Sequence, residues 1–98
     1  MLEKEIERKL VLTVREKGGL CEKWLSSTSG WPDRLVLMPG GRLAFVELKA
    51  PGKKPRPLQL HRHNQLRTLG FDVFVVDHPS QIGPLVQSLT TDHLSAVH

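Results

Sequence analysis

Three charged residues, Asp33, Glu47 and Lys49, stand at the ends of two apolar runs in the segment GWPDRLVLMPGGRLAFVELK, residues 30–49. Charged side chains beside core strands cost folding free energy unless something else requires them. Strand side chains alternate between the two faces of a sheet, so Glu47 and Lys49 share a face, with Cβ atoms about 7 Å apart. A hairpin between the two runs brings Asp33 beside them. The pattern predicts two carboxylates and one ammonium group at one edge of a sheet.

These residue types are suited to metal-assisted hydrolysis. Two carboxylates held close repel each other and favour a cation between them. A ligand set made of oxygen atoms favours Mg²⁺ or Mn²⁺ over zinc. Such an ion lowers the pKa of a bound water and neutralises charge that develops on a phosphodiester, while Lys49 orients the water or stabilises the phosphate. The alternative is an exposed ion pair between Glu47 and Lys49, with Asp33 as the cap of a turn.

The elements that position these residues follow from the hydrophobic pattern. Apolar residues at every fourth position predict a helix over residues 2–17, and shorter β-branched or alternating runs predict strands. Pro57 opens and Gly70 closes a second predicted helix, and Ser80 is a candidate cap for a third. The predicted strands are 20–25, 33–38, 42–49 and 71–76, and the second helix is 58–69. The order αβββαβα predicts an α/β fold, a central mixed sheet flanked by helices.

Length and composition limit the class of protein. The 98 residues predict a single domain over residues 1–89, followed by a flexible tail over residues 90–98. No apolar run reaches the roughly 20 residues that span a bilayer, and the first ten residues do not resemble a signal peptide. Cys21 is the single cysteine, which excludes an internal disulfide and a cysteine zinc cluster. A reducing, cytoplasmic setting fits this composition.

A continuous basic segment follows the charged triplet. The net charge is +4, and no acidic residue occurs between Glu47 and Asp72. That interval predicts a phosphate-binding surface, although a solvated loop and helix face is the alternative. His61 and His63 are two residues apart on a predicted helix, so they are not expected to form a metal-binding pair. The cations of the interval are Lys49, Lys53, Lys54, Arg56, Arg62 and Arg67.

The same segment resembles a known nuclease signature. Pro-Asp at 32–33 followed by Glu-Leu-Lys at 47–49 matches the PD-(D/E)xK motif, and the string over residues 29–59 resembles the VRR-NUC branch, the virus-type replication-repair nucleases. The resemblance extends to EIERKL near the N-terminus and to GFDVFVV. It implies a restriction-endonuclease-like core and Mg²⁺- or Mn²⁺-dependent hydrolysis of phosphodiesters. It also implies a homodimer that acts on four-way DNA junctions, as small stand-alone members do.

The resemblance assigns roles to individual residues. Asp33 and Glu47 match the metal-binding carboxylates, Lys49 the catalytic lysine, the backbone carbonyl of Leu48 a further metal ligand, and Gln59 a glutamine that places the lysine or the phosphate. A first-helix glutamate completes such sites, and Glu7 is favoured over Glu3 as both metal ligand and catalytic residue. Trp24 and Trp31 fit packing, a dimer contact or base stacking, and core or dimer packing is the commoner fate of tryptophan. Expected DNA contacts come from Ser29, Arg34, Lys53, Lys54, Arg56 and Arg62.

Together these observations predict a metal-dependent, structure-specific DNA endonuclease of a bacterial or phage-infected cell. Symmetric cutting of a four-way junction needs two sites related by a two-fold axis, which a homodimer supplies. Holliday junctions are therefore the expected substrate. The alternatives are a flap, nicking or non-specific nuclease, or a catalytically silent DNA-binding module of the same fold.

Overall fold

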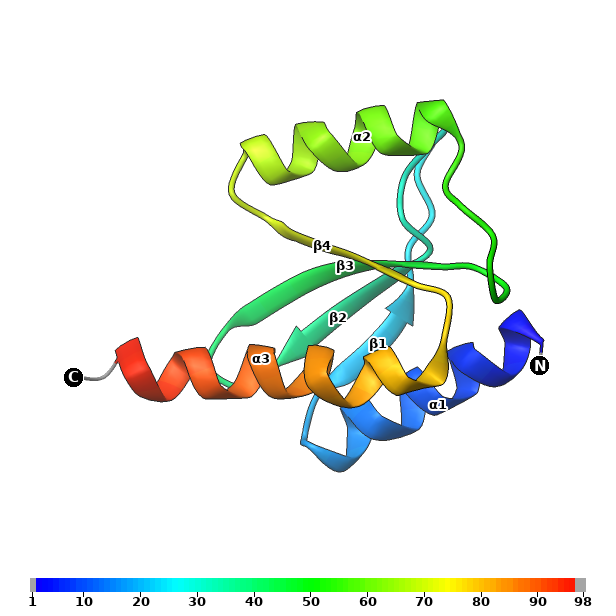
Figure 1. Ribbon diagram of the computed structural model, residues 1–98. Coiled ribbons are helices and arrows are strands. Elements are labelled where there is room, and N and C mark those ends of the chain that lie inside the picture. The colour runs from blue at the N-terminus through cyan, green and yellow to red at the C-terminus, as the bar shows by residue number, and fades with distance from the viewer. Residues whose placement is uncertain (1, 97–98) are drawn as a thin grey trace.

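A four-stranded mixed sheet separates two layers of helices in the computed structural model, which describes the backbone of residues 2–96 and the side chains of residues 2–90 (Figure 1). The strands lie in the order β1-β2-β3-β4; the first two pairings are antiparallel and β3 pairs with β4 in parallel. The fold class and the predicted order of elements are confirmed. The elements are α1 (Glu3–Glu16), β1 (Leu20–Lys23), β2 (Arg34–Met38), β3 (Arg42–Leu48), α2 (Pro57–Thr68), β4 (Asp72–Val76), the 3₁₀ turn η1 (Pro79–Gln81) and α3 (Ile82–Ala96).

The main core lies between the sheet and the helices α1 and α3. Ile6, Leu10 and Val14 are fully buried on one stripe of α1, because residues four apart in a helix share a face. Alternate residues of β3 meet this stripe, among them Ala44 and Val46. The alternation leaves the intervening residues of β3 on the opposite face of the sheet.

Among the described helices, α2 is the one that covers this opposite face (Figure 1). A second, smaller cluster there consists of Phe45, Leu66 and Val73, with Trp31 packed against it. Phe45 is its centre, since its ring lies 5.8 Å from the ring of Trp31 and 6.0 Å from that of Phe71. Glu47 follows Phe45 by two residues and therefore faces the same layer, beneath α2.

Several boundaries differ from the sequence prediction. Strand β1 ends at Lys23 rather than at position 25, although the amide of Trp24 still donates to the carbonyl of Asp33 over 2.8 Å. Ser80 does not cap the last helix: the ring of His78 accepts a hydrogen bond from the Ser80 amide and opens η1 instead. Helix α3 continues to Ala96, past the predicted domain end at 89, and the flexibility of residues 90–98 stays a prediction.

In the described part of the chain, no helix is both long and apolar enough to cross a bilayer.

Candidate active site

The hairpin between β2 and β3 brings Asp33 and Glu47 together. Arg34 pairs with Val46 in the antiparallel register, so Asp33 lies opposite Glu47, just beyond the last pair of the ladder. Directly opposite residues of an antiparallel pair point to the same face. One carboxylate oxygen of Asp33 accepts the Leu48 amide over 2.9 Å, which fixes this side chain at the end of β3. The turn Pro39–Gly41 sets this register, and Asp33 itself remains solvent-exposed.

Glu47 is a buried carboxylate in an environment that disfavours its charge. Only 1% of the residue is exposed, and burial raises its pKa from 4.5 to about 7. The negative charge of Asp33 adds to this rise, whereas the ammonium of Lys49 opposes it. Lys49 Nζ lies 3.4 Å from Glu47 Oε2. A carboxylate that is buried beside a second carboxylate is the arrangement that a divalent cation would relieve.

Gln59 connects this carboxylate to the N-terminus of α2. Its Nε2 donates to Glu47 Oε2 over 2.9 Å, and its Oε1 accepts the backbone amide of Arg56 over 2.8 Å. The second bond satisfies one of the amides that a helix leaves unpaired at its start. Gln59 therefore fixes the start of α2 over Glu47 and holds one oxygen of Glu47 in place.

Glu7 does not join the two carboxylates in this structure. Its Oε2 lies 3.1 Å from Arg34 NH2 and 3.2 Å from Arg34 Nε, on the side of the sheet that α1 covers. Over the described residues, no group of three or more His, Cys, Asp or Glu side chains is close enough to hold one metal ion. Glu7 as a third ligand stays a prediction, and it requires Glu7 to leave Arg34. Glu3, the alternative, is exposed on the first turn of α1.

Arg34 is held inside the protein. Besides its ion pair with Glu7, its NH1 donates to the Cys21 carbonyl over 3.2 Å, and only 11% of its side chain is exposed. These contacts favour a structural role that ties α1 and β1 to β2. A DNA contact from Arg34, which the sequence predicted, would have to break them.

The other predicted DNA-binding residues are more accessible. Lys53, Lys54 and Arg56 are exposed in the loop between β3 and α2, and Ser29 is exposed in the loop before Asp33. Ser29 and Arg56 line a pocket of about 320 Å³ that Gln59 also borders. Gly30 lets the loop before Asp33 pack closely against the first turn of α2. Its φ is +89°, and an added Cβ would lie 2.9 Å from the Leu58 carbonyl oxygen.

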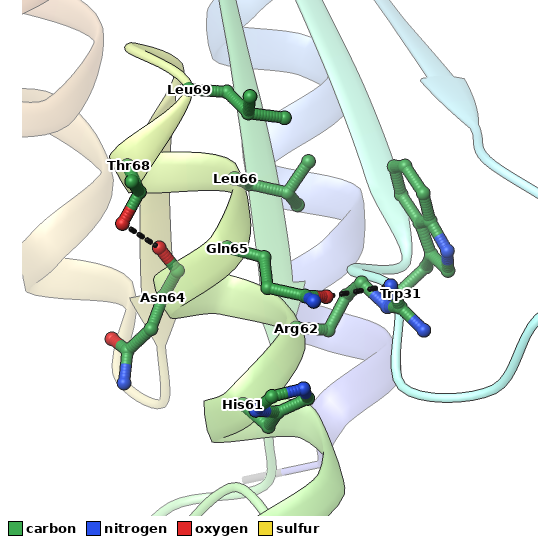
Figure 2. A pocket seen from close by; sticks show the side chains of 8 residues that line it. All are labelled: Trp31, His61, Arg62, Asn64, Gln65, Leu66, Thr68 and Leu69. Carbon is green, nitrogen blue, oxygen red and sulfur yellow. Dashed lines mark hydrogen bonds between the residues drawn. The ribbon is translucent and has the colours of Figure 1, made fainter.

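Arg62 and Trp31 form one side of a second pocket, of about 560 Å³ (Figure 2). The guanidinium carbon of Arg62 lies 5.6 Å from the ring centre of Trp31, within the range of a cation–π contact. Arg62 NH1 also donates to Gln65 over 2.7 Å. Trp31 and Trp24 belong to the aromatic cluster around Phe45, with ring centres 5.9 Å apart. Packing therefore accounts for part of the surface of both tryptophans.

His63 is the residue at the site that the sequence analysis missed. It is fully buried on the face of α2 that packs on the sheet, and its Nε2 lies 3.9 Å from Glu47 Oε1. In the sequence, the spacing of His63 from His61 bears only on a metal pair, which it does not favour. His61 is exposed and lines the pocket of Figure 2. His63 and Gln59 are four residues apart, which places both on one face of α2. That spacing is the signal in the sequence that could have identified His63.

Comparisons with known proteins agree with the observed fold. A phage protein named "Putative nuclease p44", from Acyrthosiphon pisum secondary endosymbiont phage 1, is 50% identical over 76 residues, which are 76% of this chain and 82% of that protein. A solved structure described as a VRR_NUC domain superposes with a TM-score of 0.81 at 36% identity, over 87% of this chain and 94% of the other. No protein-family model matches the chain.

Proposed function

Because the chain belongs to the VRR-NUC family of nucleases, we propose that it is a metal-dependent endonuclease that hydrolyses DNA phosphodiesters at Asp33, Glu47 and Lys49. The observation that carries the proposal is the buried carboxylate of Glu47 beside that of Asp33. Burial raises the pKa of Glu47 to about 7, so ionised Glu47 destabilises the fold unless a cation compensates. A purely structural role would be served better by an apolar residue at this position.

The donor set fits Mg²⁺ or Mn²⁺. Asp33 and Glu47 supply carboxylate oxygens, and Glu47 Oε1 has no hydrogen-bond partner among the described residues. We assign the backbone carbonyl of Leu48 as a further ligand, as the family resemblance implies. When bound, such an ion would lower the pKa of a water molecule and neutralise charge on the phosphate.

The surrounding side chains prepare this site. Lys49, with 17% of its side chain exposed, carries a positive charge 3.4 Å from Glu47 and reaches partly into solvent. We assign it the stabilisation of negative charge on the phosphate in the transition state. Gln59 keeps Glu47 oriented through its hydrogen bond to Oε2. In both assignments the side chains are already in position before the substrate binds. Groups that are preorganised in this way stabilise charge in the transition state without the cost of rearranging.

We further propose that the substrate is branched DNA, most specifically a Holliday junction, and that the active form is a homodimer within a bacterial or phage-infected cell. The exposed cations Lys53, Lys54 and Arg56 lie in the loop between β3, which carries Glu47, and α2, and they are suited to phosphate contacts. One chain carries one set of Asp33, Glu47 and Lys49, and paired incisions across a junction need two such sets related by symmetry.

The test is cleavage of end-labelled four-way junction, flap and linear duplex DNA, with Mg²⁺ or with EDTA. We expect paired symmetric incisions in the junction, in Mg²⁺ only. Asp33→Asn and Lys49→Ala should each lose at least about 100-fold in rate with an unchanged circular dichroism spectrum. Lys17→Ala, an exposed lysine just after α1, is the matched control and should cleave normally.

Other results would redirect the assignment. Equal cutting of linear duplex would indicate a non-specific nuclease, and incision of the flap alone would indicate a flap enzyme. Tight junction binding with no cleavage in Mg²⁺ or Mn²⁺ would contradict the enzymatic proposal and leave a DNA-binding module.

A further inference from the structure

The buried face of α2 presents two polar side chains to the sheet, Gln59 and His63. They are 8% and 0% exposed, and they are followed by Leu66 on the same face. Both polar groups of Gln59 are satisfied, by Glu47 and by the Arg56 amide. His63 is different, because the described residues offer neither of its ring nitrogens a hydrogen bond.

One of these ring nitrogens lies near another unsatisfied atom. Glu47 Oε1 also lacks a hydrogen-bond partner within the described part of the chain, and it lies 3.9 Å from His63 Nε2. Natural proteins rarely bury polar atoms without partners. The separation exceeds the usual 3.2 Å limit of a hydrogen bond by about 0.7 Å, which a small side-chain rotation closes. A carboxylate oxygen has two lone-pair sites, so Glu47 Oε1 can accept from His63 Nε2 and still ligate a metal ion.

We propose that His63 is a positioning residue whose Nε2–H donates to Glu47 Oε1 and thereby directs the carboxylate of Glu47 toward Asp33. The inference rests on the proposed function, in which that carboxylate holds the metal ion. Gln59 donates to Oε2 and, in this proposal, His63 donates to Oε1, so two side chains of α2 hold both oxygens of Glu47. Hydrogen bonds to ligating carboxylates from such outer partners typically change metal affinity 10- to 100-fold.

The charge around His63 is consistent with a neutral ring. Burial is the main cause that lowers the pKa of His63. The positive charges of Arg67 and Lys49 lower this pKa further, while the negative charge of Asp33 opposes them. A neutral imidazole carries one N–H, so the assignment requires the tautomer with its proton on Nε2.

Isothermal titration of Mn²⁺ into the intact protein without DNA tests this role. His63→Phe keeps the volume and removes the donor, whereas His63→Gln retains an N–H near the position of Nε2. We expect His63→Phe to weaken Mn²⁺ binding at least about 10-fold and His63→Gln to stay within about 3-fold of wild type. His61→Phe, on the exposed side of the same helix, is the matched control and should bind normally.

The outcomes separate this inference from the proposed function. If wild type binds Mn²⁺, Asp33→Asn abolishes binding and His63→Phe binds normally, the positioning role is wrong and the metal site stands. Equal losses in His63→Gln and His63→Phe would also overturn it, because they indicate packing alone. Failure of wild type to bind any Mn²⁺ overturns both.

A measurement on the wild-type protein covers the case in which His63→Phe does not fold. Long-range ¹H–¹⁵N spectra identify the tautomer of each histidine. We expect His63 to carry its proton on Nε2 with slow solvent exchange. A ring protonated on Nδ1 would overturn the proposal, because it could not donate to Glu47.

Discussion

Replacing the buried carboxylate of Glu47 with an amide should stabilise the metal-free protein while removing its activity. The pKa of Glu47 rises from 4.5 in the unfolded chain to about 7 in the folded protein, so the folded protein binds this proton more tightly. Its contribution to stability is therefore fully present below pH 4.5 and is lost as the pH rises toward 7. At about 1.4 kcal/mol per tenfold change in proton affinity, the loss approaches roughly 3 kcal/mol at pH 8.

Glu47→Gln removes this loss but leaves Lys49 without its carboxylate partner. We therefore expect a net gain of about 1–3 kcal/mol in the free energy of unfolding at pH 8 in EDTA, or a Tm higher by roughly 5–15 °C. At pH 5 the gain should fall below about 1 kcal/mol, since Glu47 is then mostly protonated in the folded state. Urea unfolding at the two pH values measures both quantities.

Two comparisons make this prediction specific. Glu22→Gln, at an exposed position of β1, should change stability by less than about 0.5 kcal/mol at either pH. Added Mn²⁺ should raise the Tm of wild type and not that of Glu47→Gln, because a ligand stabilises only the state that binds it. A Glu47→Gln variant that is less stable than wild type at pH 8, or equally stabilised at pH 5 and pH 8, would show that ionised Glu47 does not destabilise the fold.

Three further predictions concern the crowded glycine, the DNA surface and Arg34. Gly30→Ala should lower the free energy of unfolding, measured in urea, by about 2–3 kcal/mol, whereas Gly52→Ala should lower it by about 1 kcal/mol. The reason is that φ is positive at both glycines, but only Gly30 is crowded by neighbouring atoms. Equal losses would contradict the close approach of Gly30 to Leu58. In fluorescence anisotropy with labelled junction DNA, the double change Lys53→Ala and Lys54→Ala should reduce the slope of log affinity against log salt by about 2. Arg34→Ala should leave that slope unchanged and lower the Tm, because its guanidinium is already paired; the opposite pattern would make Arg34 a DNA contact.

Local patterns in the sequence were sufficient to predict most of the fold. The four-residue stripe of α1, the Pro39–Gly41 turn and the alternation along β3 each depend on short-range periodicity, which a sequence displays directly. The convergence of Asp33, Glu47 and Lys49 followed from the same rules, because a short hairpin turn fixes the register of its strands. Gln59 was found through the family resemblance rather than through its contacts.

What the sequence did not reveal depends on side-chain partners that are distant along the chain. In the sequence, Arg34 cannot be distinguished from the other cations that were candidates for DNA contacts. Its ion pair with Glu7 forms only when α1 packs on the sheet. His63 is polar on a helix whose hydrophobic pattern is weak, so its burial depends on how α2 sits over β3. The use of His78 rather than Ser80 as a cap was decided by the turn geometry before α3.

The most direct test of the central claim is anomalous X-ray diffraction from crystals of the protein soaked in Mn²⁺. The account predicts an anomalous peak between the carboxylates of Asp33 and Glu47, within about 2.0–2.4 Å of an oxygen of each, and no such peak in Asp33→Asn crystals. A peak that lies elsewhere, or full occupancy in the Asp33→Asn crystals, would contradict the account.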